Sequence, residues 1–216
     1  MKLLALSLGL GLVAAPLATA SAHDLKMAAT TGIAAADPAK VAALKKTLEG
    51  LWVGHIDAVR KVAVAEVGGD AAAAKAAENE VVANAHAIAN AVAGFYGKPA
   101  GDKLFTLLAG HWGAIKAYLD ATVAKSAAGQ SAATSQLTAN AGEIATFLSG
   151  ANPYLPKTTL SEMLMTHGSQ HISQIQQLAA KDDAAEAKTR AAMRTHIIAL
   201  ADALADAIAK QFPTKV

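Results

Sequence analysis

The chain has 216 residues, a formal net charge of +2 at neutral pH, 17% charged residues and no cysteine. The near-neutral balance, without a long charged block, gives no indication of a nucleic-acid-binding or membrane-surface protein. The lack of cysteine excludes disulfides, iron–sulfur clusters and thiolate zinc sites. Alanine is frequent, aromatic residues make up only 4% of the chain, and segments typical of β-strands are nearly absent. The composition therefore favours closely packed helices.

Residues 1–22 have the pattern of a secretory signal peptide. A short positive start precedes an apolar run, residues 3–17, and the small residues at 18–22 suit cleavage after Ala20 or Ala22. The apolar run is too short to span a bilayer, which needs about 20 residues. We therefore expect an exported protein, periplasmic or secreted, with no integral membrane segment after cleavage.

Residues 23–38 show no sustained periodicity and end in Asp37 and Pro38, a pair that typically starts a helix. We interpret this segment as a mobile N-terminal arm. If cleavage follows Ala22, His23 becomes the N-terminus, where its α-amine and imidazole together can chelate copper. The alternative is that His23 is only the first polar residue of a loose tail.

The remaining residues, 39–216, repeat at an interval of 56 positions. His55, His111 and His167 are separated by this interval. Similarity at one fixed lag over this length is typical of an internal structural repeat. Further positions keep the same spacing: Asn84, Asn140 and His196; Leu48, Leu104 and Leu160; Leu51, Leu107 and Met163; Ile88, Ile144 and Leu200.

Each repeat has the pattern of two helices joined by a turn. Apolar residues recur at alternating spacings of three and four, which predicts amphipathic helices, and turns are expected at residues 68–70, 96–99, 126–130, 150–156 and 181–183. We predict an all-α, six-helix bundle built from three tandem hairpins, 39–100, 101–156 and 157–216, in a single domain. One closed bundle would bring the repeated histidines together, whereas two smaller bundles would separate them.

Residues equidistant from a turn lie at the same height in an antiparallel hairpin. This rule predicts three level pairs: His55 with Asn84, His111 with Asn140, and His167 with His196. Each of these residues lies on an apolar seam, so the six side chains are expected to meet in one layer inside the bundle. His171 adds another imidazole one turn after His167, on the same helix face.

Neutral imidazole is the commonest metal ligand, and imidazole-rich sites without thiolates suit zinc, copper or nickel. We therefore predict a metal site, with copper or zinc favoured, in which Asn84 and Asn140 orient imidazoles by hydrogen bonds. The alternative is that each pair is a buried hydrogen bond that holds its hairpin in register. The predicted ligands are His55, His111, His167, His196 and His171.

No nucleophile–base pair, phosphate-binding loop or dinucleotide fingerprint stands out, and a Glu-x-x-His motif of di-iron proteins is missing. No sequence feature favours an enzyme. The sequence predicts an exported protein that binds a transition metal for sequestration or delivery. Two alternatives are a structural or interaction module and a carrier of haem or another small molecule; a protein partner is not specified.

Three segments, GFYGKPAGDKL (94–104), ANAGEIATFLSGANPYLPK (139–157) and ADALADAIAKQFP (201–213), resemble a group of exported bacterial helical proteins with repeated histidine- and asparagine-bearing hairpins. The resemblance covers nearly all of residues 23–216 and implies the same helical fold. It departs at DAVR (57–60), which matches a Trp-Thr-Arg run only loosely, and it implies no substrate. The positions that match the group's pattern are His55, His111, His167 and His196, with Asn84 and Asn140.

Overall fold

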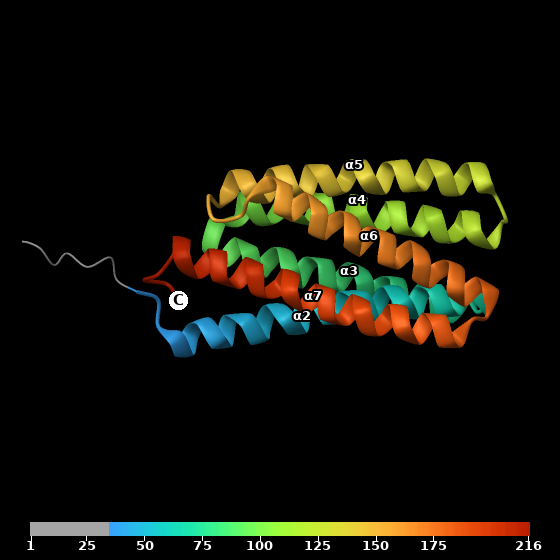
Figure 1. The fold of residues 1–216 in the computed structure, drawn as a ribbon, viewed down its shortest axis with the longest axis horizontal. Helices are drawn as coiled ribbons and strands as arrows, with labels where there is room; N and C mark the ends of the chain where they lie inside the picture. Colours follow the sequence, from blue (N-terminus) through green and yellow to red (C-terminus); the bar gives the residue numbers. More distant parts are fainter. Residues whose placement is uncertain (1–34) are drawn as a thin grey trace, which may run out of the picture. The chain divides into compact units, whose positions relative to one another are not determined.

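The computed structural model describes residues 35–216. All regular elements in this range are helices, which confirms the all-α prediction (Figure 1). The predicted signal peptide, most of the predicted arm and His23 lie outside the described residues. The six helices are α2 (Pro38–Val67), α3 (Ala71–Tyr96), α4 (Lys98–Val123), α5 (Ala127–Ala151), α6 (Lys157–Ala180) and α7 (Asp183–Gln211).

Polar side chains define where four of these helices begin. Each accepts a hydrogen bond from a backbone amide of the first turn, which satisfies a group that has no partner within the helix. A proline in the first turn also favours the start of α2 and of α4. The four N-cap residues are Asp37, Asp70, Ser126 and Asp182.

The turns inside the three hairpins have the same geometry. Gly69, Lys125 and Lys181 have positive φ angles of 77°, 55° and 56°, and the amide of the following residue donates to a carbonyl five residues earlier. This is the usual left-handed end of a helix. The prediction placed the second turn at residues 126–130, whereas α5 already begins at Ala127. Gly129 is helical and allows close packing, since an added Cβ would lie 2.9 Å from that of Ala121.

The helices close into one bundle. Each packs against its neighbours in the chain, and α7 also packs against α2, which completes a ring. In addition, α2, α4 and α6 contact one another, so one helix of each hairpin lies on the inside. The prediction of a six-helix bundle is confirmed. None of the described helices has both the length and the apolar character needed to cross a membrane.

The core consists of two apolar clusters that follow one another along the inner helices. The first contains Trp52, Leu108 and Leu164, and the second contains Ile115 and Ile175. His111 and His167 fall between these two clusters in the sequences of α4 and α6, and His55 lies beside the boundary between them on α2. A layer of imidazoles thus interrupts a mainly apolar core.

Candidate metal centre

Four histidines meet inside the bundle. His55 lies on α2, His111 on α4, and His167 and His171 on α6, with exposed fractions of 4%, 3%, 1% and 1%. Each ring offers a nitrogen, and the four nitrogens lie within 4.8 Å of one another. These four buried histidines can hold a metal ion. The structure thus brings together four of the five histidines that the sequence predicted as ligands.

The four rings surround a common point. The ring centroids of His55, His111 and His167 form a nearly equilateral triangle with separations of 6.1, 5.7 and 5.6 Å. His171 lies 5.8, 6.4 and 4.5 Å from these three rings. Since five of the six separations are similar, the centroids do not fit a square, in which four short sides accompany two long diagonals. The four ring centroids therefore lie close to the corners of a tetrahedron.

Most of the ring nitrogens have no hydrogen-bond partner within the described part of the chain. His171 Nε2 lies 3.2 Å from His167 Nε2. A buried polar atom without a partner costs about 1–3 kcal/mol, so the layer destabilises the fold when considered alone. The unpartnered buried atoms are His55 Nε2, both nitrogens of His111, His167 Nδ1 and His171 Nδ1.

Burial keeps these imidazoles neutral. Loss of solvation, with a smaller contribution from His111, lowers the pKa of His55 to about 3. Burial lowers the pKa of His111 to about 4, although the side chain of Asn140 acts in the opposite direction. The pKa values of His167 and His171 fall well below the ordinary value because of burial and the neighbouring imidazoles. Neutral imidazole is the form that binds metals.

His196 does not join the four-histidine cluster. It lies on the outer helix α7, and its Nε2 is 2.8 Å from the carbonyl oxygen of Met163 on α6. This carbonyl is one turn before His167, so His196 contacts the backbone of a ligand-bearing helix. The structure does not bring this predicted ligand to the other four, because its side chain bonds to that backbone beside the layer.

The two asparagines occupy the corresponding place in the other hairpins. Asn84 Nδ2 donates to the carbonyl oxygen of Leu51 at 2.9 Å, and Asn140 Nδ2 donates to that of Leu107 at 3.0 Å. Asn140 approaches α4 closely because Gly110 faces it, where an added Cβ would lie 3.1 Å from the amide nitrogen. These bonds tie each outer helix to its inner helix. The register interpretation expected each bond to join the asparagine to its paired histidine, whereas the acceptor is a backbone carbonyl one turn before that histidine.

Replacing Asn140 by Ala should destabilise the protein by about 1 kcal/mol, because a buried hydrogen bond between α4 and α5 is lost. Urea denaturation measures this change, and metal affinity should stay close to that of the unmodified protein. Ser135→Ala is the matched control, since Ser135 is exposed and bonds only within α5. Equal stability of the Asn140 and Ser135 variants would contradict a register role.

Sequence reasoning missed two buried polar residues close to the cluster. Gln174 and Glu186 are 2% and 5% exposed, and Gln174 Nε2 donates to Glu186 Oε1 at 2.8 Å. One sequence pattern pointed to Gln174, which follows His171 by three positions and so lies on the same face of α6. No comparable pattern marked Glu186, because its burial depends on how α7 packs against α2 and α6.

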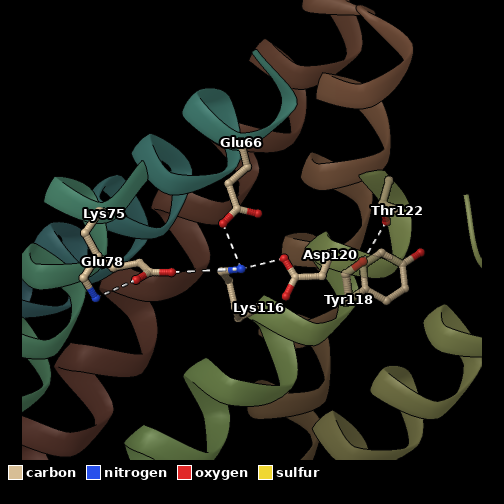
Figure 2. A network of polar contacts seen from close by, with 7 residues as sticks. All are labelled: Glu66, Lys75, Glu78, Lys116, Tyr118, Asp120 and Thr122. Atoms are coloured by element: carbon tan, nitrogen blue, oxygen red, sulfur yellow. Dashed lines mark hydrogen bonds and ion pairs between the residues drawn. The ribbon is translucent and has the colours of Figure 1, made fainter. Parts of the chain in front are cut away.

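A second polar cluster lies nearer the surface, around Lys116 (Figure 2). Its ammonium contacts Glu66 at 2.9 Å, Asp120 at 2.5 Å and Glu78 at 4.0 Å. The carboxylates are already paired with a cation and are partly exposed to solvent. This group is therefore a network of surface ion pairs. The four histidines, by contrast, are buried, and most of their ring nitrogens have no partner among the described residues.

Compared with protein-family models, with curated proteins and with solved structures, the chain shows no match. The functional interpretation therefore depends on the geometry and chemistry of the histidine cluster.

Proposed function

We propose that this protein binds one Zn²⁺ ion per chain through His55, His111, His167 and His171, and that it sequesters or delivers the ion outside the cytoplasm. The observation that carries this proposal is the group of four buried imidazoles whose nitrogens lie within 4.8 Å of one another. A bound cation would give a partner to His55 Nε2 and to one nitrogen of His111, which have none among the described residues.

The near-tetrahedral arrangement favours zinc among the metals that imidazole binds. Zn²⁺ prefers four ligands in a tetrahedron with Zn–N distances of about 2.0–2.1 Å, which places the nitrogens about 3.3 Å apart. The His167 and His171 Nε2 atoms are already 3.2 Å apart, and small side-chain rotations would bring the others closer. Cu²⁺ and Ni²⁺ prefer square or tetragonal sites, so Cu⁺ is the form of copper that this geometry suits.

A site with four protein ligands also favours holding an ion over catalysis. Catalytic zinc sites keep a position open for water or substrate, whereas structural sites are closed by four side chains. The cluster offers four imidazoles that are at most 4% exposed. The signal-peptide pattern of residues 1–22 supports export as part of this proposal.

A haem or small-molecule carrier receives less support. The enclosed apolar cavity lined by Trp52, Ile88 and Phe147 has a volume of about 30 Å³, while ligand pockets measure roughly 300–1,000 Å³. A purely structural role for the histidines is also disfavoured, because Asn84, Asn140 and His196 make the register contacts.

Titration with Zn²⁺ against a chromophoric chelator tests the proposal. We expect one equivalent per chain, together with a higher melting temperature, because a ligand that binds only the folded state stabilises it. Ile115 stands 56 positions before His171, at the equivalent place in the second hairpin. The His171→Ile variant therefore introduces the residue that this repeat position already carries there. It should retain the helices and weaken Zn²⁺ binding by more than about 100-fold.

His86→Ala is the matched control for this titration, because His86 stacks on Phe105 away from the cluster. It should bind Zn²⁺ like the unmodified protein. Absence of Zn²⁺ binding, or equal affinity in the His171→Ile variant, would refute the proposed site.

A further inference from the structure

A line of buried polar groups runs from the cluster toward the surface. Gln174 follows His171 by one helical turn on α6 and bonds to Glu186 of α7. Arg60 of α2 donates to the same carboxylate, with Nε 2.7 Å from Oε1 and a second contact of 3.3 Å to Oε2. Given the helical rise of 1.5 Å per residue, Gln174 lies about 4.5 Å along α6 from His171, so a single side chain connects the turn that carries this ligand to the Glu186 carboxylate.

The fold does not require polar residues along this line. The positions 56 and 112 residues before His171 are Ile115 and Val59, and those before Gln174 are Tyr118 and Val62. These residues are buried in the apolar cluster next to the imidazole layer. The same helical framework is therefore packed with mainly apolar side chains in two hairpins, and only the third, which contributes two ligands, carries the polar pair.

The ion pair is oriented with its negative end inward. The side chain of Glu186 is 6% exposed, whereas that of Arg60 is 30% exposed. Among residues 35–216, Glu186 is the only Asp or Glu that is buried as a whole residue. Hydrogen bonds from Arg60 and Gln174 lower the pKa of Glu186 against the opposing effect of burial, so this carboxylate is charged at neutral pH. Solvent screens the outer guanidinium more than the inner carboxylate.

A cation bound by four neutral imidazoles keeps its full charge in a region of low dielectric constant, which is costly without compensation. We propose that Glu186 is the charge-compensating carboxylate of the histidine site and that it sets the site's preference for a divalent over a monovalent cation. This inference rests on the proposed metal site. Coulomb attraction scales with the charge of the ion, so Glu186 stabilises Zn²⁺ about twice as much as Cu⁺.

The test compares Zn²⁺ and Cu⁺ dissociation constants, each measured by chelator competition without oxygen. Glu186→Gln retains the shape of the side chain and its bond to Gln174. It should weaken Zn²⁺ binding by roughly 100-fold and Cu⁺ binding by roughly 10-fold. Glu66→Gln is the matched control, because it removes a carboxylate from an ion pair in the surface network. Its partner, Lys116, stands at the repeat position of Arg60, 56 residues later. The Glu66→Gln variant should leave both affinities unchanged.

Arg60→Gln separates the electrostatic role from a structural one, because it breaks the same ion pair from its outer end. Removal of the positive charge should leave Zn²⁺ affinity unchanged or increase it, whereas a merely structural pair would make Arg60→Gln and Glu186→Gln weaken binding alike. This variant also keeps the test decisive if Glu186→Gln does not fold, and thermal unfolding monitors both proteins.

Two outcomes would overturn the inference while the metal site stands: unchanged affinities in Glu186→Gln, or equal losses for Zn²⁺ and Cu⁺. A different outcome, in which the unmodified protein binds neither ion, would instead refute the proposed function.

Discussion

Acidifying the metal-free protein from pH 7 to about pH 5 is expected to remove much of its stability. The folded state lowers the pKa of His55 to about 3 and that of His111 to about 4, whereas an unfolded histidine has a pKa of about 6.5. The unfolded state therefore binds protons first as the pH falls. The stability is fully present above about pH 6.5 and is lost progressively toward the lower, folded-state pKa values.

The size of this effect follows from proton linkage. Each buried neutral histidine loses about 1.4 kcal/mol of stability per pH unit below about 6.5. At about pH 5, His55 and His111 together cost about 4 kcal/mol, and His167 and His171 act in the same direction. The total free energy of unfolding of a typical domain is about 5–15 kcal/mol, so these four residues dominate its pH dependence.

Urea denaturation followed by circular dichroism at several pH values measures this loss. The slope of stability against pH should indicate more than two protons, and it should fall by about one proton in a His111→Leu variant. Saturation with Zn²⁺ should move the loss to lower pH, because the ion competes with protons for the same nitrogens. Stability that is constant between about pH 7 and pH 4.5 would contradict burial of neutral imidazoles.

Replacing His111 by Leu is expected to stabilise the metal-free protein and to abolish Zn²⁺ binding. Both ring nitrogens of His111 are buried without a partner among the described residues, and Leu104, Leu107 and Leu108 are buried on the same helix. An apolar side chain of similar size removes the cost of the unpaired nitrogens, a gain of about 1–3 kcal/mol at neutral pH. Such a gain raises the melting temperature by several degrees.

A loss of stability in the His111→Leu variant would instead support a structural role for the histidines. If His111 holds the hairpin in register, the Leu variant should melt at a lower temperature, with no Zn²⁺ binding in either protein. His86→Leu serves as the control, because it replaces a histidine outside the cluster by the same residue. It should bind Zn²⁺ normally and should change stability little.

Much of the fold was predictable from local patterns. The alternating spacing of three and four predicted six helices, and the interval between His55, His111 and His167 placed these residues at one level of the bundle. The turn after α4 was predicted at residues 126–130, a range that contains Gly129, but α5 already begins at Ala127. Gly129 instead allows α5 to pack closely on α4, a three-dimensional role that spacing alone does not distinguish.

The site was predictable in part, for a related reason. Counting residues from the turns placed His196 at the level of the ligands, and it does lie beside them. The distance from the turn gives the height of a residue in the bundle, but it does not specify whether a side chain on an outer helix reaches the centre. His196 instead contacts the backbone carbonyl of Met163. Glu186 escaped prediction because an acidic residue in the first turn of a helix is usually solvated.

The most direct test of the central claim is the metal content of the protein purified from its own host cells without chelators or affinity metals, measured by elemental mass spectrometry beside the His111→Leu variant. We predict close to one zinc per chain in the unmodified protein and none in the variant. No bound transition metal in either protein, with no Zn²⁺ taken up on titration, would contradict the account and would leave the histidine layer without a metal-binding role.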